Sequence, residues 1–117
     1  MLYYRIMNIE FFKKTNGNAP VEDFIINNLE SKDQKKVIRA LDRVENEQDG
    51  LANLFIAEYV KKLEKDLYEL TPDRVRILFT LKDRICWLLH IFFKKTNKTP
   101  AKELNVARER KNYIFNK

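Results

Sequence analysis

Apolar residues recur with a helical period in much of the first half of the chain and with a period of two in the second. An aromatic and branched run over residues 3–12 predicts a first strand. Pro20 stands where the first residue of a helix would, and apolar residues follow it at helical spacing. Ser31, with Gln34 three residues later, has the pattern of a capping box and predicts the start of a second helix. Gly50 is a plausible end of that helix.

The period of two begins at Leu67 and predicts three consecutive strands. They cover residues 67–70, 74–81 and 85–93. Thr99 and Pro100 then start a last helix, with the threonine as its cap. Residues 51–62 fit either a short helix or an ordered loop. The predicted order is β-α-α-β-β-β-α, an α+β fold with a mostly antiparallel sheet, two helices packed on one face and a basic C-terminal helix.

The apolar pattern also predicts how the last three strands pair, because a slip of one residue turns every side chain to the wrong face. One continuous apolar face on each of the last two strands requires a three-residue loop at 82–84. That loop pairs Arg76 with His90. A two-residue turn at 72–73 likewise pairs Glu69 with Arg76. We therefore expect these three side chains in one row on the face away from the helices.

The expected row places a carboxylate, a guanidinium and an imidazole on three adjacent strands, with neighbouring side chains about 4.5–5.5 Å apart at Cβ. Arg74 and Lys94 flank it at one end of the sheet. Each residue alone has a simpler explanation, since an exposed Glu69–Arg76 pair is worth about 0–1 kcal/mol and a lone His90 is usually a hydrogen-bonded filler. Together they suit phosphate chemistry, because a guanidinium binds phosphate through two N–H groups and a histidine moves protons near neutral pH.

The positive charge of the chain lies at its C-terminal end. Residues 1–93 carry fifteen basic and fifteen acidic side chains, so the whole net charge of +6 belongs to residues 94–117. A concentrated positive field favours a polyanion such as nucleic acid. A solvated C-terminal helix explains the charge equally well.

The length of 117 residues predicts one domain spanning 1–117, and 44% hydrophobic residues exclude disorder. We expect neither a metal nor another cofactor, because one histidine and one cysteine do not make a usual zinc site and two glycines do not make a phosphate-binding loop. Cys86, the lone cysteine, is expected to be a small core residue. The longest apolar run, 85–93, is too short for a membrane span, and the N-terminus lacks the order of a signal peptide, so we expect a cytoplasmic protein.

Three segments of the chain resemble the RelE/ParE superfamily of type II toxins. They are Leu67–Leu70, Arg74–Phe79 and Leu89–Pro100. The resemblance is closest to the phage-derived HigB-like branch, whose members carry a His-x-Phe-x-Lys-Lys-Thr-x-Lys-Thr-Pro run, found here at 90–100. Residues 9–12 and 16–21 also resemble that branch.

This resemblance implies a RelE-like toxin neutralised by a cognate helix-turn-helix antitoxin of the HigA type. The free toxin would enter the ribosomal A site and cut messenger RNA without a metal ion, inhibiting translation as an mRNA interferase. The implied catalytic residues are Glu69, Arg76, His90 and Lys94. The implied RNA-binding residues are Arg74, Lys95, Lys98 and Lys102.

The implied reaction is attack of the ribose 2′-hydroxyl on the adjacent phosphorus, which forms a cyclic phosphate and releases the 5′-oxygen. Glu69 is the candidate base and His90 the candidate acid, while Arg76, with Arg74 and Lys94, would stabilise charge on the phosphoryl oxygens. Two alternatives stay open. One is an inhibitor of DNA gyrase of the ParE type, and the other is a non-catalytic module that binds an antitoxin or nucleic acid.

Overall fold

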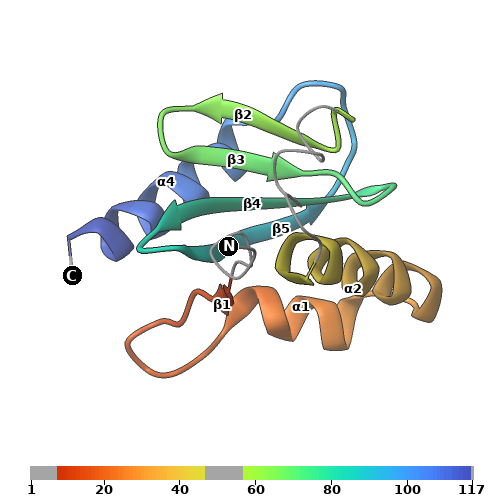
Figure 1. The fold of residues 1–117 in the computed structure, drawn as a ribbon, viewed down its shortest axis with the longest axis horizontal. Coiled ribbons are helices and arrows are strands. Elements are labelled where there is room, and N and C mark those ends of the chain that lie inside the picture. The colour runs from red at the N-terminus through yellow and green to blue at the C-terminus, as the bar shows by residue number, and fades with distance from the viewer. Residues whose placement is uncertain (1–7, 47–56, 117) are drawn as a thin grey trace.

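The computed structural model describes residues 8–46 and 57–116, and these form an α+β structure (Figure 1). The elements are β1 (Asn8–Phe11), α1 (Pro20–Asn28), α2 (Ser31–Asn46), β2 (Val60–Glu64), β3 (Leu67–Leu70), β4 (Val75–Lys82), β5 (Ile85–Phe93) and α4 (Ala101–Phe115). In the described ranges the sheet has five strands in the order β1-β5-β4-β3-β2. It is antiparallel except that β1 runs parallel to β5. The predicted fold class is confirmed.

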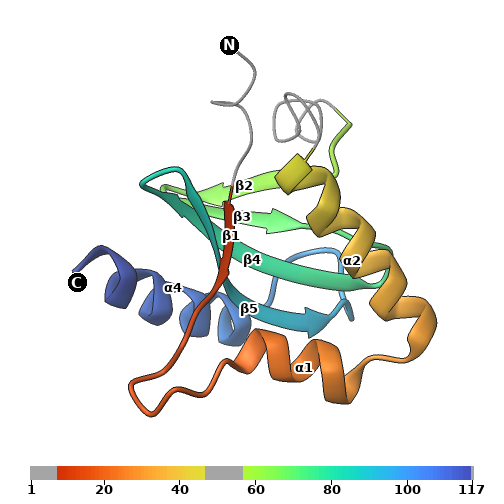
Figure 2. The same ribbon diagram turned by 60° about the horizontal axis from the view of Figure 1, so that its bottom comes forward.

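Helices cover both faces of this sheet, with α1 and α2 on one side and α4 on the other (Figure 2). The α1/α2 face carries the larger cluster of buried residues, which includes Val21, Val37, Ile77, Phe79 and Leu88. The α4 face carries the smaller cluster, which includes Leu67, Leu78, Leu89, Phe92 and Ala107. In the described residues, each face of the sheet is therefore covered at least in part by a helix.

The helix starts follow the sequence signals, but the expected caps do not form. Pro20 begins α1 and Ser31 begins α2, as predicted. Gln34 does not complete a capping box, because its side-chain amide donates to the carbonyl oxygens of Ile25 (2.8 Å) and Ile26 (3.3 Å) in α1. Satisfying the last carbonyls of α1 ties the two helices together. The stop predicted at Gly50 lies outside the described residues.

Two sequence expectations near the sheet edges were incomplete. Residues 60–64 form β2 rather than the helix or loop considered for 51–62, whose first six residues lie outside the described part. The pairing of β2 with β3 shifts between Lys62 and Glu64, so a bulge breaks the alternation that would have revealed a strand. Of the strand expected at 3–12, residues 8–11 are observed as β1, and residues 3–7 are not described.

The predicted loop between β4 and β5 is wrong. A two-residue turn at Asp83 and Arg84 connects them, with φ of 55° and 63°, as in the turns that match the twist of a hairpin. The register then shifts between Leu78 and Phe79. Leu78 pairs with His90 and Phe79 with Leu88, so Leu89 of β5 is left unpaired as a bulge. Because apolar residues occupy both faces of β5, alternation alone could not reveal this bulge.

The bulge and the β3–β4 pairing change which residues are neighbours. Leu78 pairs with His90 and Arg76 pairs with Phe92, whereas Arg76 was expected opposite His90. Glu69 pairs with Leu78 and not with Arg76. Both displacements on β4 are of two residues, so Glu69, Arg76 and His90 keep their predicted face although their partners change. Before the bulge the faces of β5 are reversed, because Trp87 and Leu89 pack on the α4 side and Cys86 and Leu88 on the α1/α2 side.

Candidate functional site

The candidate site is built on the α4 face of β3, β4 and β5. Glu69, Leu78 and His90 are adjacent in one row across these strands, and Arg76 lies on the same face, one pair further along β4. The expectation that carboxylate, guanidinium and imidazole share a face is therefore confirmed. This face lies away from α1 and α2, as expected, but it is not open, because α4 packs on it through an apolar cluster that includes Ala107. The packing of α4 decides what can reach these groups.

Glu69 is held from above by the segment that leads into α4. Its side chain is buried, with the residue 7% exposed, and its Oε2 accepts a hydrogen bond from the Thr99 hydroxyl at 2.8 Å. Thr99 was expected to cap α4, but Pro100 occupies the cap position and no side chain caps this helix end. The threonine thus fixes the β5–α4 connection to the sheet instead.

His90 is likewise held by α4. Its Nε2 lies 2.8 Å from Oε1 of Glu103, and its ring stacks on Phe92 with the centroids 5.6 Å apart. Burial lowers the pKa of His90, and the hydrogen bond to Glu103 only partly offsets this effect. The imidazole is therefore mainly neutral at pH 7, with the proton on Nε2 donated to the carboxylate and Nδ1 able to accept.

Arg76 is fixed by backbone carbonyls and not by an acid. Its Nη1 donates to the carbonyl oxygens of Asp73 (2.6 Å) and Val75 (2.8 Å). Within the described residues, no carboxylate forms an ion pair with this guanidinium. Carbonyl partners orient the side chain without neutralising it, so its positive charge remains available to an anion.

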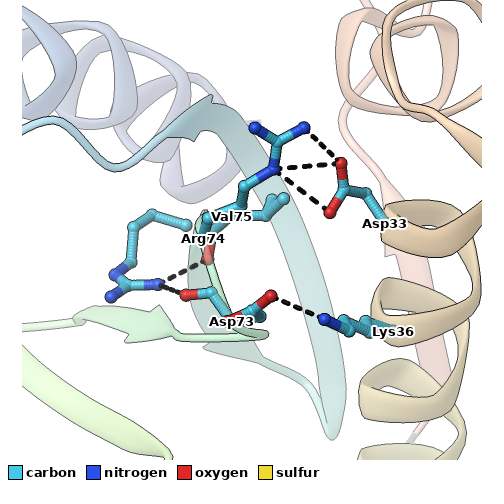
Figure 3. Close-up of polar contacts among 6 residues, drawn as sticks. Asp33, Lys36, Asp73, Arg74 and Val75 are labelled. Atoms are coloured by element: carbon cyan, nitrogen blue, oxygen red, sulfur yellow. Dashed lines mark hydrogen bonds and ion pairs between the residues drawn. The ribbon is translucent and has the colours of Figure 1, made fainter.

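Arg74 does not join Arg76. Figure 3 shows its guanidinium gripping both oxygens of Asp33 in α2, with Nη2 2.7 Å from Oδ2. Asp33 is 1% exposed, and the hydrogen bond from Arg74 lowers the pKa of its carboxyl against the opposing effect of burial. The guanidinium also lies over the Phe93 ring, 4.9 Å from its centroid. Asp33 therefore already binds the Arg74 side chain, and the RNA-binding role expected for Arg74 stays a prediction.

The same region holds a second bond between α2 and the β3–β4 connection. Lys36 donates to Oδ2 of Asp73 at 2.6 Å (Figure 3). Since the carbonyl of Asp73 accepts from Arg76, the connection that orients Arg76 is itself anchored to α2. Neither partner could be predicted from local pattern, because Asp33 and Lys36 are distant from residues 73–76 along the chain.

The basic C-terminal region divides into two groups of different use. Lys94, expected to be catalytic, is exposed after β5, and so are the three lysines expected to bind RNA: Lys95, Lys98 and Lys102. The backbone N–H of Lys94 donates to the carbonyl of Arg74 at 2.8 Å, which places Lys94 at the same end of the sheet as Arg76. The cations further along α4 bind the sheet instead, as in the Arg108–Glu64 ion pair (2.7 Å).

A group of exposed cations on α2 escaped the sequence interpretation. Lys32, Lys36, Arg39 and Arg43 follow one another at helical spacing along this helix and are exposed. The signal was present in that spacing. It was missed because equal numbers of acidic residues in the first 93 positions hide it from any count of charge.

Two further groups have limited chemistry. Cys86 is buried, and burial raises the pKa of its thiol, so it is a core residue as expected and not a nucleophile. Within residues 8–46 and 57–116, no three His, Cys, Asp or Glu side chains gather as metal ligands.

None of the helices described is long and apolar enough to cross a bilayer.

Comparison with known proteins supports the architecture. No curated protein matches the chain. The family described as phage-derived protein Gp49-like (DUF891) matches residues 25–112, a range that includes every candidate residue of the site. This family consists of RelE-like, toxin-like proteins and is associated with toxin–antitoxin systems, in which a toxin has an antitoxin partner. By this match over most of its length, the chain belongs to the Gp49-like family of phage-derived, toxin-like proteins.

Proposed function

We propose that this protein is the toxin of a type II toxin–antitoxin system, of the HigB-like branch, and that it cuts messenger RNA on the ribosome. Family membership supports a toxin. The observation that carries the nuclease proposal is Arg76, a guanidinium oriented by two carbonyls and not neutralised by an acid of the described residues. Lys94, which is exposed, lies at the same end of the sheet as Arg76.

In the proposed reaction Arg76 and Lys94 bind the scissile phosphate and stabilise the charge that grows on its oxygens. The 2′-hydroxyl loses its proton and attacks phosphorus, a cyclic phosphate forms, and the departing 5′-oxygen takes a proton from water. Lys95, Lys98 and Lys102 supply salt-dependent contacts to RNA phosphates. Arg74 acts only indirectly, by holding the connection that carries Arg76.

His90 and Glu69 are the two candidate acceptors of the 2′-hydroxyl proton. The lowered pKa of His90 supports a role as base and not as acid, because it favours the neutral imidazole, the form that can accept a proton. Glu69 is buried, and its Oε2 accepts a hydrogen bond from the Thr99 hydroxyl just before α4. RNA therefore gains access to either group when the start of α4 moves off the sheet.

The test is induced expression of wild type, Arg76→Ala and Arg76→Lys, with growth curves and primer extension on a translated message. Loss of the guanidinium should slow cleavage by about 10²–10³-fold, as for one electrostatic donor in a transition state. Lysine keeps the charge but loses the fork, so it should restore part of the rate. Arg39→Ala, which removes the same charge from α2, is the matched control.

Cleavage by Arg76→Ala that equals wild type would exclude the role given to Arg76. Intact messages together with gyrase-linked DNA breaks would select the gyrase inhibitor. Absence of any growth defect in wild type would favour the non-catalytic binding module. Coexpression of a helix-turn-helix protein of the HigA type should restore growth.

A further inference from the structure

A cavity of about 410 Å³ lies between the β1–α1 connection and α4. Its lining residues are Phe12, Lys14, Thr15, Val106, Glu109, Arg110 and Tyr113. Its volume falls in the range of sites that hold small organic molecules. None of these residues belongs to the candidate site described above.

Aromatic side chains form one wall of this cavity. Phe12 is buried, and Tyr113 meets it edge to face, with ring centroids 5.7 Å apart and an interplanar angle of 86°. Tyr113 is 40% exposed, unusually open for a large ring. A ring fixed by a buried neighbour and open to solvent offers a ready surface for stacking.

Arg110 also lines the cavity and has an unusual environment. Its Nη1 donates to the carbonyl of Leu89 at 2.8 Å, and its guanidinium lies 5.4 Å from the centroid of Phe12. The side chain is partly buried, yet no carboxylate in the described part of the chain forms an ion pair with it. A guanidinium withdrawn from water without an acid partner is costly and favours an anion beside it.

The rim adds one more cation and connects the cavity to His90. Lys14 is exposed on the β1–α1 connection, and Glu109, also exposed, is the single acid of the lining. Arg110 also lines a second cavity of about 140 Å³ together with His90. Arg110 thus lines both cavities, the second of which His90 also lines.

We propose that this cavity binds one nucleotide of single-stranded RNA, with its base stacked on Tyr113 and its phosphate between Lys14 and Arg110. This inference rests on the proposed function and extends it, because the bound nucleotide would lead the strand past His90. Stacking suits any base, so the site would bind RNA with little sequence preference. An acidic peptide would satisfy the two cations but would leave the aromatic wall without a flat partner.

The test measures binding of a fluorescent single-stranded RNA hexamer to the full chain, with matched pairs of variants. Tyr113→Leu is compared with Phe115→Leu, a ring of similar exposure on the same helix outside the cavity. Lys14→Ala is compared with Lys13→Ala, its exposed neighbour. We expect Tyr113→Leu to weaken binding about 5- to 150-fold, and Lys14→Ala also to weaken it while reducing its salt dependence. The controls should stay within about twofold of wild type.

Equal weakening within each pair, or no binding by wild type, would overturn the nucleotide site. A polyglutamate peptide that binds as tightly as RNA, with the same sensitivity to Tyr113→Leu, would overturn the choice of occupant. Thermal unfolding of each variant shows whether it is folded, and a photo-crosslink from 4-thiouridine RNA to the Tyr113 peptide gives a readout that needs no variant.

Failure of this inference and failure of the proposed function give different results. Ribosomal cleavage that survives Tyr113→Leu and Lys14→Ala, with unchanged hexamer binding, leaves the nuclease and removes the cavity. Hexamer binding that depends on these residues, in a chain that never cuts a message, leaves the cavity and removes the nuclease.

Discussion

The two faces of the sheet are held to their helices in different ways. On the α1/α2 face, two helices bury an extended apolar cluster that includes Phe79 and Val37. The Arg74–Asp33 and Lys36–Asp73 ion pairs add to that cluster. On the α4 face the apolar cluster is smaller, so polar contacts make up a larger part of what holds the helix. These contacts include Thr99 to Glu69, His90 to Glu103, Arg110 to the Leu89 carbonyl, Lys82 to the Ile114 carbonyl and Arg108 to Glu64.

This difference has a functional consequence. Apolar burial is lost as one unit, whereas a hydrogen bond contributes about 0.5–1.5 kcal/mol net and can be exchanged for one to water or to a ligand. We therefore expect that less free energy is needed to separate α4, which covers the candidate site, from the sheet than to separate α1 and α2. The α1/α2 layer acts as the foundation, and α4 acts as a cover over Glu69 and His90.

The largest expected effect comes from the foundation. Phe79→Ala should lower the free energy of unfolding by about 3–5 kcal/mol, because a fully buried ring leaves a cavity under α1 and α2. Phe92→Ala, on the α4 face, should cost less because α4 can settle into the space. Chemical denaturation of both variants measures the difference, and a larger loss for Phe92→Ala would reverse the comparison.

The next effect concerns the buried carboxylate that joins α2 to β4. Asp33→Asn should lower the melting temperature clearly, since it leaves Arg74 without its partner. The pKa of Asp33 is lowered in the folded protein, so its contribution is present above pH 3.8 and is lost as the pH falls below that value. Acid titration of stability should show a shallower loss in Asp33→Asn than in wild type. Asp73→Asn is the control, because it breaks the exposed Lys36–Asp73 ion pair. A fall in melting temperature as large as that of Asp33→Asn would contradict the importance of burial.

A smaller effect is expected at the cover. Glu103→Gln weakens the hydrogen bond to His90 and should make opening of α4 easier by about 1 kcal/mol. Hydrogen exchange should become faster in α4 and stay unchanged in α1 and α2. Glu109→Gln, an exposed change on the same helix, is the control. Equal exchange in the two variants would mean that the contact does not hold the cover.

The smallest effect is a pH dependence from the only histidine of the chain. Burial lowers the pKa of His90 below its ordinary 6.5, so protons bind the unfolded chain more readily than the folded one. The melting temperature should therefore fall modestly as the pH drops from 6.5 toward 5. His90→Gln should abolish this dependence, and NMR titration of the imidazole measures the pKa directly. A melting temperature that rises over this interval would show the opposite shift.

Sequence reasoning succeeded where a signal is local and failed where partners are distant. The residues of β3 and β5 and the start of α1 follow from alternation and from Pro20. The placement of Glu69, Arg76 and His90 on one face also follows, because the two shifts on β4 preserve parity. Their cross-strand neighbours could not be predicted. Apolar residues occupy both faces of β5, so the bulge at Leu89 leaves the hydrophobic pattern unchanged.

Arg74 and Arg76 show the same division most clearly. Because these arginines are two residues apart, the strand pattern alone predicts the same surroundings for both. One binds buried Asp33 and the other binds carbonyls of its own connection, because α2 packs beside the first.

The amino-acid sequence by itself determined the elements, the fold class, the family resemblance and the face on which the charged groups stand, since these depend on short-range periodicity and motif spacing. Only the tertiary structure decided that α4 covers that face, that Thr99 and Glu103 hold Glu69 and His90, and that Arg110 lines a cavity. Those outcomes depend on which side of the sheet a helix packs, and no local pattern in the chain encodes that choice.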